Sequence, residues 1–389
     1  MAQKQDYERF GAEVFGPFLY GFVRWLKAEL IARGYDKVFF FSRDGYMMQK
    51  AFDRINDTAI RSEYVYFSRK ALRAPLLTDC TDFEDSLKYL ARERFISIGK
   101  LLDYYGFPAK AHAQLAAAAD CTPELEIPFD ALSQNPHAQK IFTQNRDRIA
   151  AYAAEQAALL ERYLRQTGMQ GRFAIADVGW HGNMQYYLEQ FCKQRGIAAE
   201  PGGFYIGILP VQKLRSPVNG YVYSPGNTAK RKQILSFFGL FEKLLQSAEG
   251  SAAGYAEDST GEIVPLCAPY EFDTERDSAV LSAISALQNG ALRFVSWAES
   301  CRLQDTDDML TAPLMRFGMY PTVKDVQLFS AFYNTDGTRT YYTAQKPLYR
   351  YQPKEFLHAL ANSPWKTGFM KSAFRLPLPY YAVYSLLRK

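Results

Sequence analysis

The sequence predicts an α/β fold with a mainly parallel sheet, and three observations support this class. Apolar runs with the length of buried strands recur along the first 223 residues. Polar or glycine-containing turns follow these runs, and helical patterns follow the turns, as in βα units. Hydrophobic residues make up 48% of the 389 residues, which is enough for a large buried core. We expect about five strands, at residues 38–41, 64–67, 173–176, 203–209 and 221–223, with helices on both faces of the sheet.

The chain divides into three expected parts. Residues 1–79 and 167–260 contain the strand patterns and form the α/β core, which begins with a long amphipathic helix at 9–33. Residues 80–166 have helical patterns and form an insertion, in a position where a cap over an active site is common. Residues 261–389 form a mostly helical C-terminal region that is rich in aromatic side chains.

A polar turn follows the first strand. Ser42, Arg43, Asp44 and Gly45 come directly after the apolar run, and a helical pattern covers residues 46–55. In open α/β sheets, ligands bind beyond the carboxyl ends of the strands at a switch point. This turn therefore lies at the edge of the sheet where a ligand is expected.

A second stretch of the same design runs from Gly171 to Gln185. An apolar run leads to Asp177 at the expected carboxyl end of a strand, a glycine loop follows, and a helix begins near Asn183. Unpaired N–H groups and the dipole at such a helix start favour an anion, so phosphate is the predicted ligand. The glycine spacing matches neither the P-loop nor the dinucleotide fingerprint. The candidate ligand contacts are Gly179, Trp180, His181, Gly182, Asn183 and Gln185.

Three cations lie close together after the second strand. Arg69, Lys70 and Arg73 belong to a predicted loop that ends at Pro75. Arginine forks and a lysine charge in such a loop are suited to clamping a pyrophosphate, whereas an isolated basic loop is often only a solvated surface segment. We expect Arg43, Arg69 and Arg73 to point into one cleft.

Two glutamates follow the strand patterns. Glu242 lies in a helical pattern at 237–246, and Glu249 lies in the segment rich in Gly, Ser and Ala that comes after it. A glutamate before such a segment can face a cleft or can cap the end of the helix, and the sequence leaves both interpretations open.

The composition and net charge limit which binding partners and which cellular compartment are expected. The net charge of +5 is too small to indicate nucleic acid, but it suits anionic substrates or contact with the cytoplasmic face of a membrane. We see no secretory signal and no uncharged apolar run of about 18 residues, so we expect no membrane span. Five cysteines at irregular spacings indicate reduced thiols, and thus a cytoplasmic protein.

Four stretches in this order carry a resemblance to a known family: FFFSRDGYMM, VYFSRKALRAP, ADVGWHGNMQ and FEKLLQSAEGSAAGY. Together they resemble the glycan phosphoribosyltransferase module of bacterial polysaccharide-assembly proteins, over roughly residues 8–255. That module is often fused to haloacid-dehalogenase-type phosphatases. The resemblance implies a fold like that of type I phosphoribosyltransferases. It also implies transfer of 5-phosphoribosyl from phosphoribosyl pyrophosphate to a sugar hydroxyl, with release of pyrophosphate.

The resemblance further implies a cofactor and partners. Mg²⁺ would assist the transfer, and the acceptor would be a glycan, free or lipid-linked, in O-antigen (lipopolysaccharide) or capsule biosynthesis. A companion phosphatase would then leave a ribofuranose. Nucleic acid is not among the expected partners, and a peripheral membrane contact is.

The resemblance also assigns roles to the candidate residues. The turn from Ser42 to Tyr46 would hold the pyrophosphate, the basic segment after the second strand would close over it, and the stretch from Asp177 to Gln185 would hold the ribose hydroxyls and the 5-phosphate. Asp44 and Asp177 are the expected metal ligands, and Glu249 is the expected acceptor contact.

The general base remains open at this stage. This sequence has Ala176-Asp177 where the family has a pair of acids, and Trp180 stands where several relatives have a catalytic acid. Displacement of pyrophosphate needs neutralisation of the leaving group and a base for the incoming hydroxyl. The candidates for the base are Asp44, which we slightly prefer, His181, Glu242 and Glu249.

Two other functions are consistent with parts of the sequence. The run FFFSRDGY superficially matches the first motif of haloacid-dehalogenase phosphatases, with Asp44 as its second acid. The nucleophile position would then be Ser42, which cannot form an aspartyl phosphate. A non-catalytic module is the other alternative. It would dock assembly enzymes or a lipid-linked glycan through the aromatic, basic C-terminal region.

Overall fold

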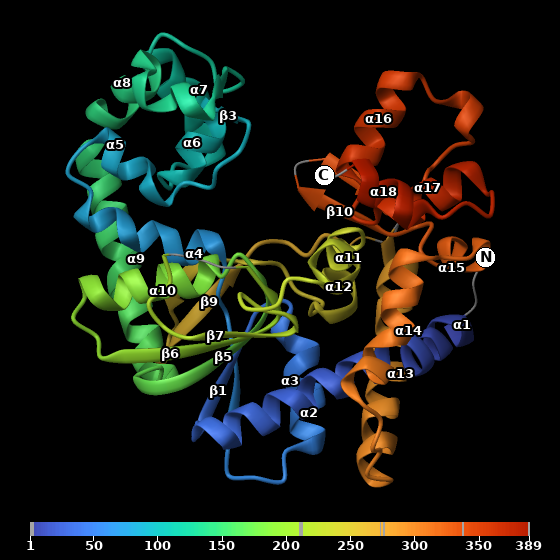
Figure 1. Cartoon of the computed structure of the whole chain (residues 1–389). Coiled ribbons are helices and arrows are strands. Elements are labelled where there is room, and N and C mark those ends of the chain that lie inside the picture. Colours follow the sequence, from blue (N-terminus) through green and yellow to red (C-terminus); the bar gives the residue numbers. More distant parts are fainter. Residues whose placement is uncertain (1–3, 210–212, 273, 275–276, 337, 388–389) are drawn as a thin grey trace.

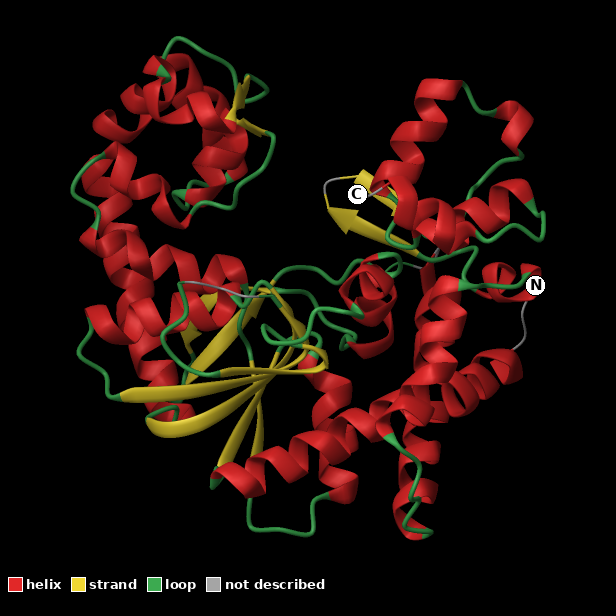
Figure 2. Ribbon diagram, in the orientation of Figure 1, coloured by secondary structure: helices red, strands yellow, loops and turns green. Residues whose placement is uncertain are grey.

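The computed structural model describes residues 4–209, 213–272, 274, 277–336 and 338–387. At its centre is a five-stranded, all-parallel sheet in the order β2-β1-β5-β6-β7 (Figure 2). The strands are β1 (Lys37–Phe41), β2 (Arg61–Val65), β5 (Gly171–Trp180), β6 (Ala199–Ile208) and β7 (Val218–Tyr223). The predicted α/β class and its parallel sheet are confirmed.

All five strands differ from their expected bounds at one end or both, and β2 and β5 show the reasons most clearly. β2 ends at Val65 instead of Phe67, and it lies at the edge of the sheet, where its polar first residues are partly exposed and give no apolar signal. β5 does not end at Ala176 but continues to Trp180, because its last residues pair with β6 as far as Ile208.

The order of the strands creates a switch point between β1 and β5. The chain passes from β1 to β2 on one side and returns to β5 on the other side, where Phe40 pairs with Ala176. Ligand sites in open α/β sheets form at such points, beyond the carboxyl ends of the strands. The ends of β1 and β5 are therefore the place where a site is expected.

Helices cover both faces of the sheet, as predicted. On one face, Phe39, Phe41 and Ile175 share a core with α4 (Arg69–Arg73), α9 (Arg146–Thr167) and α10 (Asn183–Gln194). On the other face, Phe40 and Ala176 share a core with α2 (Gly16–Arg33), α3 (Gly45–Ile55), α12 (Phe238–Leu245) and α13 (Ser278–Ser300). Alternate residues of β1 thus enter opposite cores, which explains why this strand is apolar from Val38 to Phe41.

The segment between β2 and β5 builds a lobe of its own (Figure 1). The lobe has a separate hydrophobic core, and α9 connects it to the sheet, because Ile149 packs in the lobe core and Leu160 packs under the sheet. A short antiparallel pair of strands accompanies its helices. The elements from the sheet to α9 are η2 (Ala74–Asp79), α5 (Phe83–Ser86), η3 (Leu87–Tyr89), β3 (Phe95–Ser97), α6 (Ile98–Tyr104), α7 (Ala109–Ala118), β4 (Glu126–Pro128), η4 (Phe129–Gln134) and α8 (Pro136–Gln144).

The C-terminal part of the chain returns to the N-terminal helices. α13 and α14 pack against α1 (Lys4–Phe10), the π-helical turn η1 (Gly11–Phe15) and α2, in the same core as one face of the sheet. Every described helix is too short or too polar to traverse a lipid bilayer. The elements after β7, besides α12 and α13, are α11 (Arg231–Leu235), β8 (Ala252–Glu257), β9 (Ile263–Cys267), α14 (Asp307–Met319), α15 (Val323–Leu328), β10 (Tyr333–Asp336), β11 (Thr338–Tyr341), η6 (Leu348–Arg350), α16 (Pro353–Asn362), α17 (Lys366–Phe374) and α18 (Tyr380–Leu387).

The contact between the first helix and α13 requires glycine, and this gives a test of the packing. A Cβ atom at Gly290 would lie 2.1 Å from the carbonyl oxygen of Glu8. Because that oxygen belongs to the backbone, we expect Gly290→Ala to separate the helices and to cost about 1–3 kcal/mol. The melting temperature, followed by circular dichroism, should fall by roughly 3 °C or more. Gly226→Ala is the matched control, since a Cβ there meets no atom within 4 Å, and an equal loss in both variants would contradict this packing.

Candidate active site

Two aspartates from distant parts of the sequence meet at the switch point. Asp44 precedes the first residue of α3 and makes no capping hydrogen bond. Asp177 lies within β5, opposite Tyr205, and not at the strand end as expected, because β5 extends further. Asp44 is partly exposed, whereas Asp177 is only 7% exposed and its Oδ1 atom has no hydrogen-bond partner. An unpaired buried carboxylate oxygen is a position that a ligand can satisfy.

The two carboxyl groups hold their protons unusually strongly. Burial, together with the charge of Asp177, raises the pKa of Asp44 to about 7, although Arg43 and Lys243 act to lower it. Burial also raises the pKa of Asp177 to about 7. The backbone N–H of Val178 opposes this shift and the charge of Glu242 adds to it. Neighbouring acids with pKa values near neutrality are typical of functional sites.

A pair of cations lies next to the acids, linked through a glutamate that the sequence did not indicate. Arg43 Nη1 and Lys243 Nζ each lie 2.6 Å from a carboxylate oxygen of Glu271. Arg43 Nη1 also donates to the backbone oxygen of Glu249 at 3.2 Å. Lys243 is 3% exposed, and burial lowers the pKa of its ammonium group. A lysine among the apolar residues of α12 is a pattern from which a buried, functional Lys243 could have been predicted. The sequence around Glu271 has no comparable pattern.

The backbone of the segment after Asp177 requires glycine at two positions. Gly179 has a φ of +99°, and a Cβ atom there would lie 2.7 Å from the carbonyl oxygen of Gly207. Gly182 also has a positive φ and caps α10, which begins at Asn183 as predicted. The N–H groups at the start of this 12-residue helix are available to an anion.

Trp180, three residues after Asp177, packs among aromatic side chains. Its ring stacks on Tyr223 at 6.3 Å and meets Phe241 edge-on at 5.8 Å. The buried Nε1 atom of Trp180 has no hydrogen-bond partner. The next residue, His181, has its pKa lowered by partial burial and by the charge of Arg231, so it is neutral at pH 7.

Three predicted ligand contacts instead support the frame of the site. The buried Ser42 hydroxyl donates to the carbonyl oxygen of Phe67 at 3.0 Å. Gln185 is also buried, and its side chain accepts from Tyr205 and donates to Glu189. Gly45 allows α3 to approach β1, because a Cβ there would lie 2.7 Å from the backbone of Phe40.

The basic segment after β2 is a helix and not the expected loop. The Ser68 hydroxyl caps α4 by accepting the N–H of Ala71 at 3.0 Å. Arg69 and Lys70 are exposed, and the Arg73 guanidinium lies 5.7 Å above the ring of Tyr104 in the lobe. Lys70 and Arg73 line a cavity of about 160 Å³ between α4 and the lobe. Arg43 and Arg73 therefore have different partners, Glu271 and Tyr104, and the convergence of the three arginines on one cleft stays a prediction.

The two predicted glutamates occupy different environments. Glu242 is half-buried on α12 and close enough to raise the pKa of Asp177. The Glu249 carboxylate accepts hydrogen bonds from the hydroxyls of Tyr64, at 2.6 Å, and Ser247, at 2.7 Å. Asp44, Asp177 and Glu242 thus form an acidic cluster, with Glu249 in a hydroxyl-lined niche beside Arg43.

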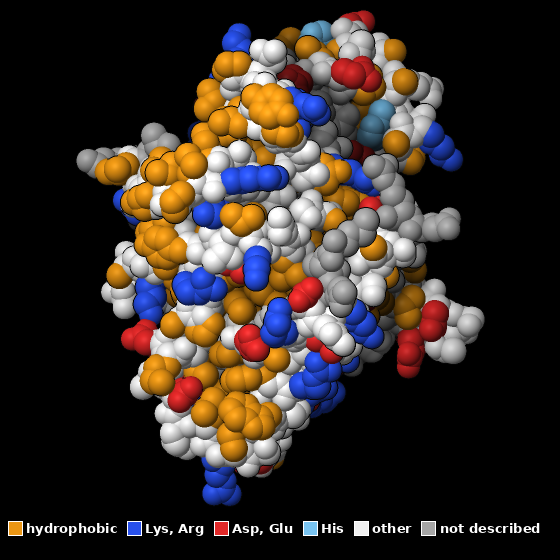
Figure 3. All heavy atoms as spheres, turned by 90° about the vertical axis from the view of Figure 1, so that its right-hand side faces the viewer, with side chains coloured by type: hydrophobic (Ala, Val, Ile, Leu, Met, Phe, Trp, Pro, Cys, Tyr) orange, Lys and Arg blue, Asp and Glu red, His pale blue; other side chains and the backbone are white. Residues whose placement is uncertain are grey.

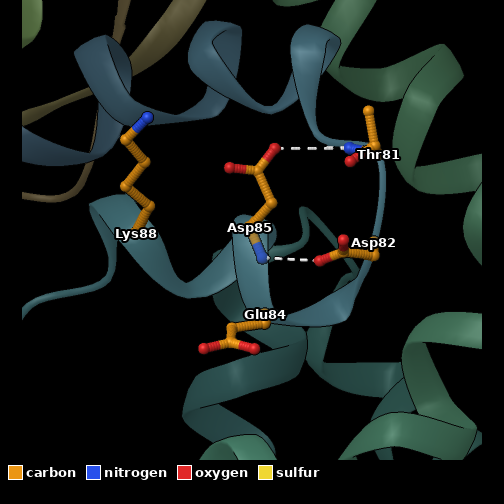
Figure 4. Close-up of a pocket in the computed structure, with 5 residues that line it drawn as sticks. All are labelled: Thr81, Asp82, Glu84, Asp85 and Lys88. Atoms are coloured by element: carbon orange, nitrogen blue, oxygen red, sulfur yellow. Dashed lines mark hydrogen bonds between the residues drawn. The ribbon is translucent and has the colours of Figure 1, made fainter.

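A separate surface hollow lies in the lobe (Figure 4) and is lined by Thr81, Asp82, Glu84, Asp85 and Lys88. Asp82 accepts the N–H of Asp85 at 2.8 Å, and Asp85 accepts the N–H of Thr81 at 3.3 Å. These carboxylates stabilise the short helix α5, and the hollow is distant in the chain from the ends of β1 and β5. We therefore place the candidate active site at the switch point.

Comparison with known proteins does not assign this chain to a family. The chain matches no protein-family model, and a search of curated proteins finds no relative. The function must therefore be argued from the site.

The acids suit a magnesium ion that is held mainly by its substrate. Among the described residues, no three His, Cys, Asp or Glu side chains gather into a metal site. Mg²⁺ commonly needs only one or two carboxylates, with substrate phosphates and water as its other ligands. Asp44 and the unpaired oxygen of Asp177 fit that smaller requirement.

The raised pKa values predict how stability depends on pH. An unfolded aspartate loses its proton near pH 3.8, whereas the folded carboxyl keeps it until about pH 7, so the folded state is destabilised as pH rises through this window. Asp177→Asn removes this penalty. In the absence of metal, we expect its melting temperature to exceed that of the unmodified chain by roughly 3 °C at pH 8. The difference should shrink by pH 5. The control is Glu124→Gln, an exposed carboxylate in the lobe, and a pH-independent difference for Asp177→Asn would contradict the assignment.

Proposed function

We propose that this chain is a glycan phosphoribosyltransferase that moves 5-phosphoribosyl from phosphoribosyl pyrophosphate to a sugar hydroxyl. The observation that carries the proposal is the proximity of Asp44 and Asp177 at the switch point, where the charge of Asp177 raises the pKa of Asp44, near the partly exposed Arg43 and the buried Lys243. The N-terminus of α10 follows on the same strand as Asp177. A donor with two phosphate ends and a diol between them needs this combination of acceptors and anion-binding groups. The turn after β1, the basic segment after β2 and the stretch around the end of β5 also follow one another along the chain in the order of a type I phosphoribosyltransferase-like fold. In such a fold they would hold the pyrophosphate, close over it, and hold the ribose and 5-phosphate.

The donor can be placed by the chemistry of the groups. The N–H groups at the start of α10, from Asn183 onward, suit the 5-phosphate, and the unpaired Oδ1 of Asp177 suits the ribose hydroxyls. Arg43, with Lys243 behind it, suits the pyrophosphate. Mg²⁺, if held by Asp177 and the pyrophosphate, would neutralise charge on the leaving group and would leave Asp44 free to act as a base.

Asp44 is the general base in this proposal. It is partly exposed, so an acceptor hydroxyl can reach it, and its pKa of about 7 is suited to taking a proton near neutral pH. His181, although neutral, lies on the loop that faces the phosphate end of the donor. Glu249 would bind the acceptor glycan, and Trp180 offers a ring face to a sugar.

The alternative phosphatase function is disfavoured by one contact. The nucleophile of a haloacid-dehalogenase phosphatase would have to stand at Ser42, and that hydroxyl is buried and donates to a backbone oxygen. A non-catalytic docking module would not need a buried acidic pair, because such a pair destabilises the fold. We infer that the acceptor is a bacterial polysaccharide intermediate in the cytoplasm, and that a companion phosphatase acts on the product.

The proposal predicts a reaction that can be measured directly. With phosphoribosyl pyrophosphate, Mg²⁺ and a panel of synthetic or lipid-linked glycans, the chain should release pyrophosphate and add one phosphoribosyl unit to an acceptor, as detected by mass spectrometry. Release of phosphate from a simple phosphomonoester would instead support the phosphatase. Failure to bind any sugar phosphate would support the docking module.

Asp177→Ala should weaken donor binding. The ribose hydroxyls would lose charge-assisted hydrogen bonds in a closed site, which typically costs about 1.5–3 kcal/mol, or roughly ten- to a hundred-fold in affinity. Isothermal titration calorimetry with phosphoribosyl pyrophosphate and Mg²⁺ measures this loss. Asp36→Ala, an exposed residue just before the other end of β1, is the control and should bind the donor normally. Equal affinities for all three proteins would remove Asp177 from the donor site.

Asp44→Ala should have a different effect. A base acts on the acceptor proton in the transition state, so we expect turnover to fall by roughly a hundred-fold or more while donor affinity changes little. Calorimetry and acceptor kinetics on the same preparation separate the two quantities. If donor binding weakens and turnover of the bound complex is kept, Asp44 is a metal or pyrophosphate ligand and not the base.

A further inference from the structure

The positive charge of the chain is concentrated at its C-terminal end. Residues 345–389 contain eight Lys or Arg residues and a single acid, Glu355. The whole chain has 46 basic and 41 acidic residues, so the first 344 residues have 38 basic and 40 acidic residues. All of the net positive charge therefore comes from this last segment. Glu355, the acid of this segment, pairs with Lys346 at 2.6 Å.

Exposed apolar side chains are concentrated in the same segment. Among the described residues, fifteen large apolar side chains are exposed, and seven of them lie between residues 345 and 387. They are Leu348, Tyr349, Leu357, Leu376, Leu378, Val383 and Leu386. A segment with about one-ninth of the residues thus has nearly half of these side chains, which exceeds the scattered exposure expected on a protein surface.

The segment is anchored on its inner side and open on its outer side. Trp365 is fully buried and donates its Nε1–H to the carbonyl oxygen of Gly318 at 2.8 Å, which fixes α17 to α14. In contrast, α16 buries none of its residues. The loop between α17 and α18 is exposed over residues 375–379, whose sequence alternates leucine with proline after an arginine.

Cations and apolar side chains are interspersed on this outer side. Figure 3 looks onto it and shows hydrophobic side chains alternating with Lys and Arg over the upper part, where α16–α18 lie in Figure 1. The Arg350 guanidinium lies 5.8 Å from the ring of Tyr349, and Lys371 Nζ lies 5.9 Å from the ring of Tyr380. Aromatic, leucine and basic side chains in this mixture are typical of protein surfaces that lie in the headgroup region of a bilayer.

We infer that the outer side of residues 345–387 is a binding surface for an anionic lipid membrane. The cations would meet lipid phosphates, each contributing through a field that extends over about a Debye length. The exposed leucines of the 375–379 loop and of α18 would enter the boundary between headgroups and acyl chains. Charge complementarity favours this occupant over a second copy of the chain, because two such surfaces would repel each other. The inference does not depend on the proposed chemistry.

Vesicle sedimentation with the full chain tests this inference. Vesicles of phosphatidylcholine with about 30% phosphatidylglycerol are compared with pure phosphatidylcholine vesicles, at low and at high salt. We expect the partition coefficient for anionic vesicles to be at least about tenfold higher at 0.1 M NaCl, and to fall at 0.5 M NaCl. Equal partition into both vesicles, or a lack of salt dependence, would overturn the inference.

Two sets of variants locate the surface. Arg350→Gln with Arg375→Gln should lower partition into anionic vesicles by roughly thirty-fold, since each cation contributes about a factor of five. Leu376→Ser with Leu378→Ser and Leu386→Ser should lower it by about tenfold or more. Ile31→Ser with Leu125→Ser replaces exposed apolar side chains elsewhere and is the control. Equal loss in the control would overturn the location. So would a dimer, detected by light scattering, that forms through these leucines without vesicle binding.

Discussion

The candidate site depends on one constraint: the fold holds the carboxyl groups of Asp44 and Asp177 close together, although their negative charges repel each other. Asp44 follows β1 and Asp177 lies within the adjacent strand β5. Burial raises both pKa values to about 7, and the charge of Asp177 adds to the shift of Asp44 while that of Glu242 adds to the shift of Asp177. Such a pair is unfavourable in a folded protein unless its surroundings are rigid. The rigidity comes from a sheet with cores on both faces and from helices at both ends of the chain that pack on one of them. Arg43 and Lys243, bridged by Glu271, offset part of the negative charge.

This arrangement favours the binding of a charged ligand. In the free protein, the acids keep protons that they would lose in water, and the Oδ1 atom of Asp177 has no partner. A ligand that brings hydroxyl groups or a divalent cation would relieve both conditions at once. Binding of such a ligand would therefore offset part of the free-energy cost of holding these groups together.

Much of the fold and the core of the site could be predicted from local patterns. Continuous apolar runs marked the inner strands, and the rule that ligands bind beyond strand ends predicted that the segments of Asp44 and Asp177 lie at the same edge of the sheet. The structure places the two close enough for the charge of Asp177 to raise the pKa of Asp44. The predicted bounds of the edge strand β2 lay too far along the chain, because its first residues are polar and partly exposed. The basic segment was expected as a loop, yet Ser68 caps it into a short helix. Glu271 could not be found, because its partners Arg43 and Lys243 come from separate elements and only the tertiary fold brings them together.

The central claim is that a phosphoribosyl donor binds across the ends of β1 and β5. A crystal structure of the chain with Mg²⁺ and phosphoribosyl pyrophosphate tests it most directly. The account predicts the 5-phosphate at the N–H groups at the start of α10, the ribose hydroxyls at Asp177, and the pyrophosphate at Arg43. A donor bound elsewhere, for example in the cavity between Arg73 and the lobe, would contradict it.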